Sequence, residues 1–195
     1  MLVDASLIAA NTRPRQSPRS TDINDPWLMR FAAGLGETAP QFLDNRVPLL
    51  AHPCFLQGAL ENPCMFLSVY AVGVTNKEAS AVVHASIDSL LPAPLRPAGS
   101  ALATEFGVVS AASRRAGVEL VTEISHSLDD ETVCRSRWGC VILGHELAEE
   151  ELASLGEAPD WPALPSSTGP TADSSEVTLE IAPTYMHKQS PVACD

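Results

Sequence analysis

The chain has 195 residues, of which 45% are hydrophobic, so it is long and apolar enough for one domain with a buried core and does not have the composition of a disordered chain. Its formal net charge is −12 with only two lysines, which argues against general binding to a phosphate backbone, and we expect no nucleic-acid partner. No apolar run reaches the ~18–20 residues of a membrane span, and Asp4 precedes the apolar patch 5–10 where a secretory signal would carry positive charge, so we expect no membrane segment and an intracellular protein.

The cysteines predict neither a disulfide scaffold nor a metal site. Their number is odd and none are spaced as C-x-x-C, which favours reduced thiols in an intracellular protein. Cys134 and Cys140 have an even spacing on one predicted strand, so we expect both to pack into the core on the same face.

The first predicted elements are an arm and a short helix. Residues 1–22 show no sustained periodicity, and arginines between prolines predict a flexible, extended and solvated arm. Asn24 is an N-cap candidate, Pro26 suits a first helical turn, and an apolar stripe from Trp27 follows until Gly34. We therefore predict a helix that begins near residue 24.

The next region combines a loop with a buried element. Residues 37–53 contain three prolines and predict a loop. The apolar runs 54–60 and 65–75 are separated by Asn62 and Pro63. The second run is typical of either a buried helix or a strand, and we favour a helix that continues the first around Pro63. Residues 78–92 alternate and predict a strand that ends at the following prolines.

Three long alternating segments dominate the chain, at residues 100–113, 117–128 and 131–143. In the middle segment one face is apolar and the other carries glutamates and serines, the period-two pattern of a half-buried strand. Strands of ~11–13 residues exceed the usual ~5–6, and consecutive long strands joined by tight turns favour a curved antiparallel sheet that wraps another element.

The remainder of the chain predicts a linker and a tail. Residues 145–153 have a helical but acidic pattern, and 146–175 as a whole form an acidic linker that is rich in Pro and Ser. Residues 176–181 alternate as a short strand within the tail 176–195. The main domain is thus expected at residues 23–145.

Two sets of motifs resemble a known family. Residues 31–44, FAAGLGETAPQFLD, are similar to the A-x-x-x-G-D-x-N-P-x-H-x-D motif of MaoC-like, R-specific enoyl hydratases. Val83 and His84, then PLRPAG at 94–99, then WGCVIL at 138–143, resemble the non-catalytic N-terminal half of the peroxisomal double-hot-dog hydratase. Together the motifs cover residues 24–144.

The resemblance implies an α+β fold with a single hot-dog domain, in which a long curved antiparallel sheet wraps a central helix, flanked by extended N- and C-terminal arms. It also implies water addition to a trans-2-enoyl thioester, or the reverse dehydration, by an Asp and a His five residues apart. The substrate would be a coenzyme A or carrier-protein thioester of fatty acid or polyketide metabolism, with no further cofactor and no metal. The implied location is cytoplasmic or peroxisomal.

The chain departs from this motif at both catalytic positions. Glu37 stands at the Asp position and Phe42 at the His position, and phenylalanine cannot transfer a proton. The family's N-terminal halves also lack this dyad. We therefore expect a half that pairs, as a homodimer or heterodimer, with a hot-dog partner carrying the Asp/His dyad. The tail 176–195 resembles the start of a second hot dog, with Asp195 at the catalytic Asp position.

The candidate catalytic residues are Glu37 and His84, either of which would serve a stand-alone dehydratase or isomerase of a polyketide-like thioester. The candidate substrate-binding residues are Phe42, His52, Arg114 and Arg115. The simpler alternatives are a loop carboxylate for Glu37, a hydrogen-bonded core histidine for His84, a loop histidine for His52 and hairpin-turn charges for the arginines.

A third hypothesis is a catalytically inactive dimerising or acyl-binding module; one that only dimerises would lack a pocket for an acyl chain. The three histidines outside these assignments are predicted to be surface groups: His126, His145 and His187.

Overall fold

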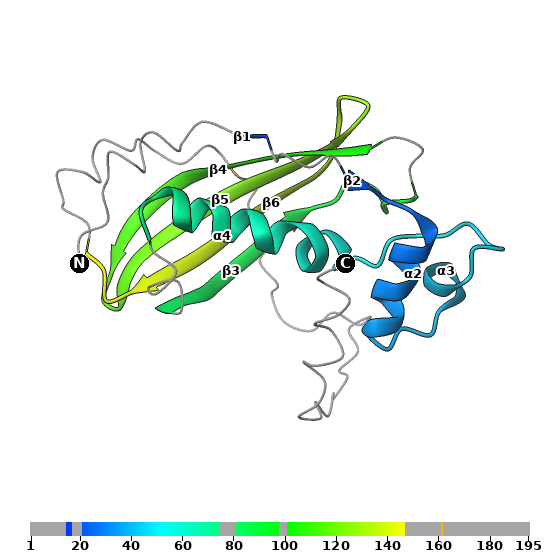
Figure 1. The fold of residues 1–195 in the computed structure, drawn as a ribbon, viewed down its shortest axis with the longest axis horizontal. Coiled ribbons are helices and arrows are strands. Elements are labelled where there is room, and N and C mark those ends of the chain that lie inside the picture. Colours follow the sequence, from blue (N-terminus) through cyan, green and yellow to red (C-terminus); the bar gives the residue numbers. More distant parts are fainter. Residues whose placement is uncertain (1–14, 17–20, 75–80, 98–100, 147–160, 162–195) are drawn as a thin grey trace, which may run out of the picture.

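The computed structural model describes residues 15–16, 21–74, 81–97, 101–146 and 161. Its centre is a strongly curved antiparallel sheet with a helix lying across the hollow side (Figure 1). The strand order is β1-β4-β5-β6-β3, with β2 pairing separately with β4. The strands are β1 Arg15–Gln16, β2 Thr21–Asp22, β3 Val82–Leu90, β4 Ala101–Arg114, β5 Gly117–Leu128 and β6 Glu131–Leu143.

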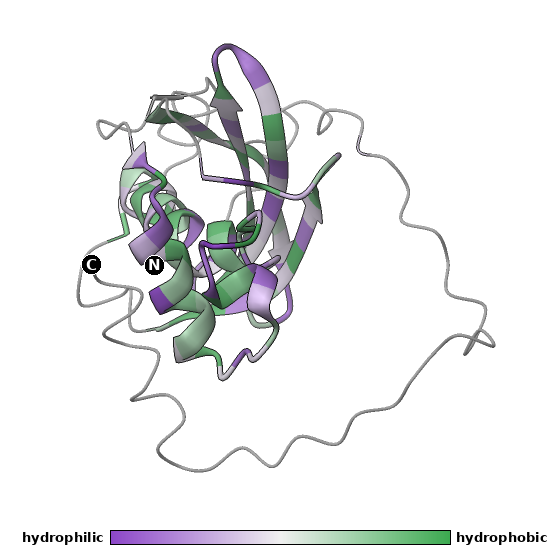
Figure 2. Cartoon of the chain, turned by 90° about the vertical axis from the view of Figure 1, so that its right-hand side faces the viewer, coloured by the Kyte–Doolittle hydropathy of each residue, from purple (hydrophilic) through white to green (hydrophobic). Residues whose placement is uncertain are grey.

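The three long strands β4, β5 and β6 lie within one or two residues of their predicted bounds. The turn between β5 and β6 consists of Asp129 and Asp130, whose φ angles are +49° and +66°. A two-residue hairpin of type I′ has left-handed backbone at both positions, and aspartate tolerates it better than most residues. The alternation of polar and apolar residues along the strands is visible in Figure 2.

The helix α2 spans Asp25–Gly34, and its start is confirmed: the side chain of Asn24 accepts the N–H of Trp27 at 3.1 Å. The predicted loop 37–53 contains one short helix that was not predicted, α3 Pro40–Leu43. Its first turn begins at Pro40, whose fixed φ favours helical backbone and whose missing N–H costs nothing there.

The predicted central helix that continues around Pro63 is confirmed. A π-helical turn, η1 Gln57–Glu61, leads without a break into α4 Asn62–Ala71. Proline has no N–H to donate and its ring crowds the carbonyl of the preceding turn, so a widened turn just before Pro63 accommodates it. The helix ends earlier than the predicted residue 75, because Gly73 takes a φ of +90°.

The core forms where α4 packs against the concave face of β4, β5 and β6. Cys140 belongs to it and Cys134 to the apolar cluster described below; neither has exposed surface, which confirms their predicted burial. Burial raises the pKa of Cys64, Cys134 and Cys140 to about 11. A second apolar cluster joins α2 to the start of the central helix and to one end of β4 and β6.

The strand β3 forms one edge of the sheet, shorter than the predicted 78–92; residues 75–80 lie outside the described part. Val83 and Ile87 on β3 are 46% and 45% exposed. At the other edge, β1 and β2 of the N-terminal segment pair with β4. None of the described helices has the length and hydropathy needed to cross a membrane.

The predicted acidic helix 145–153 falls almost entirely outside the described residues, as do most of the linker and the whole tail 176–195 with Asp195 and His187. One linker residue is described. The ring of Trp161 lies 4.5 Å from the guanidinium of Arg137 and 5.3 Å from that of Arg135, which places it against β6.

Candidate functional site

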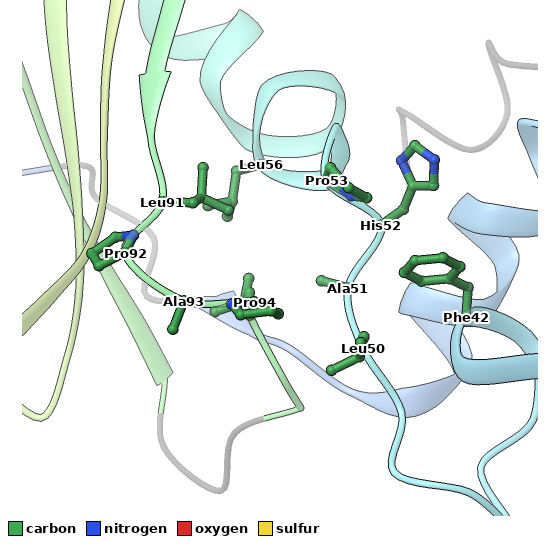
Figure 3. Close-up of a pocket in the computed structure, with 11 residues that line it drawn as sticks. Phe42, Leu50, Ala51, His52, Pro53, Leu56, Leu91, Pro92, Ala93 and Pro94 are labelled. Carbon is green, nitrogen blue, oxygen red and sulfur yellow. The ribbon is translucent and has the colours of Figure 1, made fainter. Parts of the chain in front are cut away.

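An apolar hollow of about 310 Å³ lies where two loops meet, near the lower end of the range of ligand pockets, ~300–1,000 Å³. One loop leads into the central helix and the other leaves β3; the N–H of Ala51 donates to the carbonyl of Leu95 at 2.8 Å and pins them together. In Figure 3, Phe42 and His52 lie side by side, and the segment from Leu91 to Pro94 lies opposite. The lining residues are Phe42, Leu50, Ala51, His52, Pro53, Leu56, Leu91, Pro92, Ala93, Pro94 and Leu95.

Phe42, at the position of the family's catalytic histidine, contributes its ring to this lining. It is carried by α3, which is held to the loop by the N–H of Leu50 donating to the carbonyl of Gln41 at 2.8 Å. The ring centroids of Phe42 and His52 are 5.6 Å apart. The position that would transfer a proton in the family motif is therefore an apolar wall here.

Glu37 lies beside this hollow and is held in place by the chain that follows it. Its Oε1 accepts the N–H groups of Thr38 at 2.7 Å and Ala39 at 2.9 Å. The N–H of Ala39 first, and that of Thr38 second, lower the pKa of Glu37 from its usual 4.5, and His52 adds a smaller effect. Its Oε2 lies 3.9 Å from Nε2 of His52.

His52 has a fixed tautomer in its neutral form. Its Nδ1 accepts the N–H of Cys54 at 3.2 Å, so the ring proton must lie on Nε2. That nitrogen faces Glu37, and His52 is the one polar side chain in a lining that is otherwise apolar.

The structure thus brings together three of the six candidate residues, Glu37, Phe42 and His52. His84 is exposed on β3, paired in register with Cys140, and stacks edge-on against Trp138 at 5.1 Å between centroids. It is separated from the hollow by the length of β3. The prediction that His84 is a core histidine is therefore wrong, because it stands on the edge strand.

Arg114 and Arg115 lie at the turn between β4 and β5. The Nε–H of Arg114 donates to Oε2 of Glu119 at 2.7 Å, an ordinary ion pair across a hairpin. These arginines are not among the residues that line the hollow.

A second Glu–His pair, which was not predicted from the sequence, lies deep in the core. Glu61 and His126 have no exposed surface. The carboxylate of Glu61 accepts from Nε1–H of Trp138 at 2.6 Å and from the hydroxyl of Ser136 at 2.8 Å. Nε2 of His126 lies 3.2 Å from it, and Nδ1 of His126 lies 2.9 Å from the hydroxyl of Thr104. We call these five residues the Glu61 cluster.

The prediction that His126 is a surface group is wrong. Its position has the same parity as Leu120, Thr122 and Ile124, the buried face of β5, and this signal was available in the sequence. His145 was also predicted at the surface but is only 7% exposed, with Nδ1 3.0 Å from the carbonyl oxygen of Leu143.

The Glu61 cluster joins the central helix to the sheet and does not form a ligand-binding site. Glu61 ends the π-helical turn and its hydrogen-bond partners come from β5 and β6, while Thr104 of β4 binds His126. Because these side chains are sealed from solvent, a substrate cannot reach them in this structure. Among the described residues no group of three His, Cys, Asp or Glu side chains is placed to hold a metal ion.

Several solved structures have a fold similar to that of this chain. No protein-family model matches the chain, and no curated protein matches it by sequence. A MaoC-like dehydratase from Phytophthora capsici superposes with a TM-score of 0.64 at 19% identity, covering 84% of this chain and 57% of that one. A C-terminally truncated HadBC complex, a (3R)-hydroxyacyl-ACP dehydratase from Mycobacterium tuberculosis, has a TM-score of 0.54 at 16% identity, covering 66% and 93%.

HtdX from Mycobacterium tuberculosis is similar as well, with a TM-score of 0.58 at 14% identity over 92% of this chain and 63% of that one. The chain is therefore a hot-dog protein with the fold of the MaoC-like dehydratases, and the predicted fold class is confirmed. It spans about six-tenths of the length of two of these three neighbours.

Proposed function

We propose that this chain is the half of a hot-dog hydratase or dehydratase that binds the acyl end of an enoyl or 3-hydroxyacyl thioester without supplying the Asp/His dyad. A hot-dog partner carrying D-x-x-x-x-H would supply the proton transfers. The proposed reaction adds or removes water and needs no cofactor beyond the coenzyme A or carrier protein of the thioester.

The observation that carries this proposal is the placement of Phe42. At the histidine position of the motif, the ring lines an apolar hollow instead of facing a reacting atom. Glu37 supports the same reading, because two backbone N–H groups stabilise its charged form and a carboxylate with a lowered pKa is a weak general base at neutral pH.

The edge strand β3 is the surface that we propose for the partner. An edge strand offers unpaired backbone groups to another strand, and Val83 and Ile87 add exposed apolar side chains to it. The HadBC structure is a complex of two different hot-dog chains, which supports a heterodimer as one form of this assembly.

Binding of a saturated acyl-CoA to the purified chain tests the hollow. We expect Phe42→Asp to weaken binding by at least about tenfold, because a carboxylate would replace an aromatic ring of the apolar lining against which the acyl chain packs. Val47→Asp is the matched control: Val47 follows α3, is 38% exposed and lies outside the lining, so its variant should bind like the wild type.

Hydration assays, with and without a dyad-bearing hot-dog partner, then test whether the partner supplies the proton transfers. We expect turnover only in the presence of the partner. Turnover by the chain alone that is lost in Glu37→Gln would contradict the half-site and favour the stand-alone enzyme. Absence of acyl-CoA binding would contradict the proposed function itself.

A further inference from the structure

The face of the sheet that is turned away from the central helix carries a group of charged side chains. Ser136 and Trp138 of β6 point into the core, so Arg135 and Arg137, which alternate with them, lie on the opposite, convex face. Glu123 of β5 pairs in register with Arg137 and therefore lies on the convex face as well.

A single carboxylate holds both arginines. Oε1 of Glu123 accepts a hydrogen bond from Nη2 of Arg135 at 2.7 Å, and Oε2 accepts one from Nε of Arg137 at 2.9 Å. On its other side, Arg137 pairs in register with Asp88 of β3, so it has a carboxylate residue on each neighbouring strand. This arrangement fixes two planar guanidinium groups next to each other.

The ring of Trp161 lies over both guanidinium groups. Its centroid is 4.5 Å from Cζ of Arg137 and 5.3 Å from Cζ of Arg135, inside the ~6 Å within which an aromatic face attracts a cation. Indole is the strongest partner among the aromatic side chains, and a planar guanidinium can stack on it. The side chain of Arg137 is only 11% exposed, against 38% for Arg135, so the closer cation is largely removed from water, where the attraction is stronger.

The indole N–H does not contribute to this contact. Nε1 of Trp161 is buried and has no hydrogen-bond partner within the described part of the chain. Because a buried donor without an acceptor is unfavourable, the contacts of the ring face must outweigh this cost. The site therefore recognises the face of an aromatic ring and not its polar edge.

The contact also determines where the linker lies. β6 ends at Leu143, so the chain has turned back along the strand by the time it reaches Trp161. The entropy lost on closing such a loop grows only slowly with loop length, so one docked side chain can hold the linker on the domain.

We propose that Glu123, Arg135 and Arg137 form an indole-binding site on the convex face of the sheet, and that its ligand is Trp161 of the same chain. The docked ring fastens the linker to the face turned away from α4. Because the site is built from β5 and β6 and not from the residues of the hollow, it forms with or without an acyl thioester. Its test is therefore separate from that of the proposed function.

Digestion of the native chain with an endoproteinase that cleaves after glutamate tests this docking, because Glu157 lies close to Trp161 in the sequence. Cleavage requires the chain around the bond to leave the domain surface. We expect Trp161→Ala and Arg137→Leu each to speed cleavage after Glu157 at least about fivefold, as measured by mass spectrometry. The two variants remove opposite sides of the contact, and Trp161→Ala leaves the strands unchanged.

Arg114→Leu is the matched control. Arg114 also binds a glutamate across two strands, but it is not one of the arginines beneath Trp161. Cleavage of this variant should proceed at the rate of the wild type. Equal rates in the wild type, Trp161→Ala and Arg137→Leu would overturn the indole-binding site.

Fluorine NMR of the chain labelled with 5-fluorotryptophan gives a second readout. The chain has three tryptophans, and Trp161→Phe identifies the resonance of Trp161. In the wild type this resonance should differ from its position in urea, and in Arg137→Leu it should move towards that position while the resonance of Trp27 shows that the domain is still folded. A Trp161 resonance at its unfolded position in the native wild type would also overturn the site.

Discussion

The Glu61 cluster and the rim of the hollow around Glu37 each place a glutamate beside a histidine, but in opposite environments. Glu61 and His126 are fully buried, with Nε2 of His126 3.2 Å from Oε1 of Glu61, and the carboxylate also accepts hydrogen bonds from Trp138 and Ser136. Glu37 and His52 are partly exposed and 3.9 Å apart, with one carboxylate oxygen already committed to the backbone.

The comparison shows that residue types alone do not decide the role of a Glu–His pair. The role depends on whether the pair still has hydrogen-bond donors and acceptors that no protein group uses. A buried carboxylate whose three partners come from β5 and β6 has nothing to offer a ligand, and removing it would leave several donors unpaired. A partly exposed pair that is too far apart to bond internally keeps a donor and an acceptor for something else. The first pair is therefore structural, and the second is a candidate for binding.

The largest expected effect is on stability, from Glu61→Ala. The change leaves Trp138, Ser136 and His126 without their acceptor in the core, and we expect the free energy of unfolding to fall by about 3–5 kcal/mol. Urea denaturation followed by circular dichroism measures it. Glu37→Ala, at the exposed rim, should leave the urea midpoint close to that of the wild type.

Glu61→Gln sharpens this test, because glutamine keeps one oxygen for Trp138 but turns an N–H₂ group towards the remaining partners. The free energy of unfolding of Glu61→Gln should lie between those of the wild type and Glu61→Ala. If Glu61→Ala were as stable as the wild type, the cluster would not join the helix to the sheet, and the contrast between the two pairs would be lost.

The fold could be read from the sequence largely because its signals are local. Alternation fixed β4, β5 and β6 to within one or two residues, and Asn24 and Pro26 marked the start of α2. The Glu61 cluster could not be found this way. Its hydrogen bonds join residues 65, 75 and 77 positions apart in the chain, and Glu61 falls between two apolar runs with no pattern of its own.

The candidate site was predictable in part. A motif resemblance singled out Glu37 and Phe42, and the loop position singled out His52. Their association was not predictable, since it depends on the short helix α3 and on the bond from Ala51 to Leu95 that closes the hollow. His84 entered through the same resemblance, yet its place on an edge strand keeps it away from the other three.

The cysteines extend the comparison to reactivity. Cys134 lies in the sealed region, with its sulfur 3.6 Å from the hydroxyl of Ser136, and burial raises its pKa to about 11. Cys54 is exposed and adjoins the rim, where its N–H binds His52. Because the thiolate is the reactive form, we expect iodoacetamide at pH 7.5 to modify Cys54 at least about tenfold faster than Cys134.

Peptide mapping by mass spectrometry resolves the two sites, and the same reaction in urea should remove the difference. Fast modification of Cys134 in the folded chain would mean that solvent reaches the Glu61 cluster. The sealed pair would then need to be reconsidered as a site that a ligand can enter.

The smallest expected effect concerns how the contribution of Glu37 to stability changes with pH, compared with the contribution of the nearby carboxylate of Asp44. The pKa of Glu37 is lowered by backbone N–H groups, so its charged form favours the folded state above its usual pKa of 4.5, and this contribution is lost as the pH falls through the lowered value. Arg46, through a side-chain hydrogen bond, lowers the pKa of Asp44 from 3.8 to about 2, so its contribution should persist to more acid pH. The difference in melting temperature between wild type and Glu37→Gln should therefore shrink below pH 4.5, before that for Asp44→Asn does. A difference for Glu37→Gln that grows on acidification would mean that the backbone N–H groups do not hold the carboxylate in its ionised form.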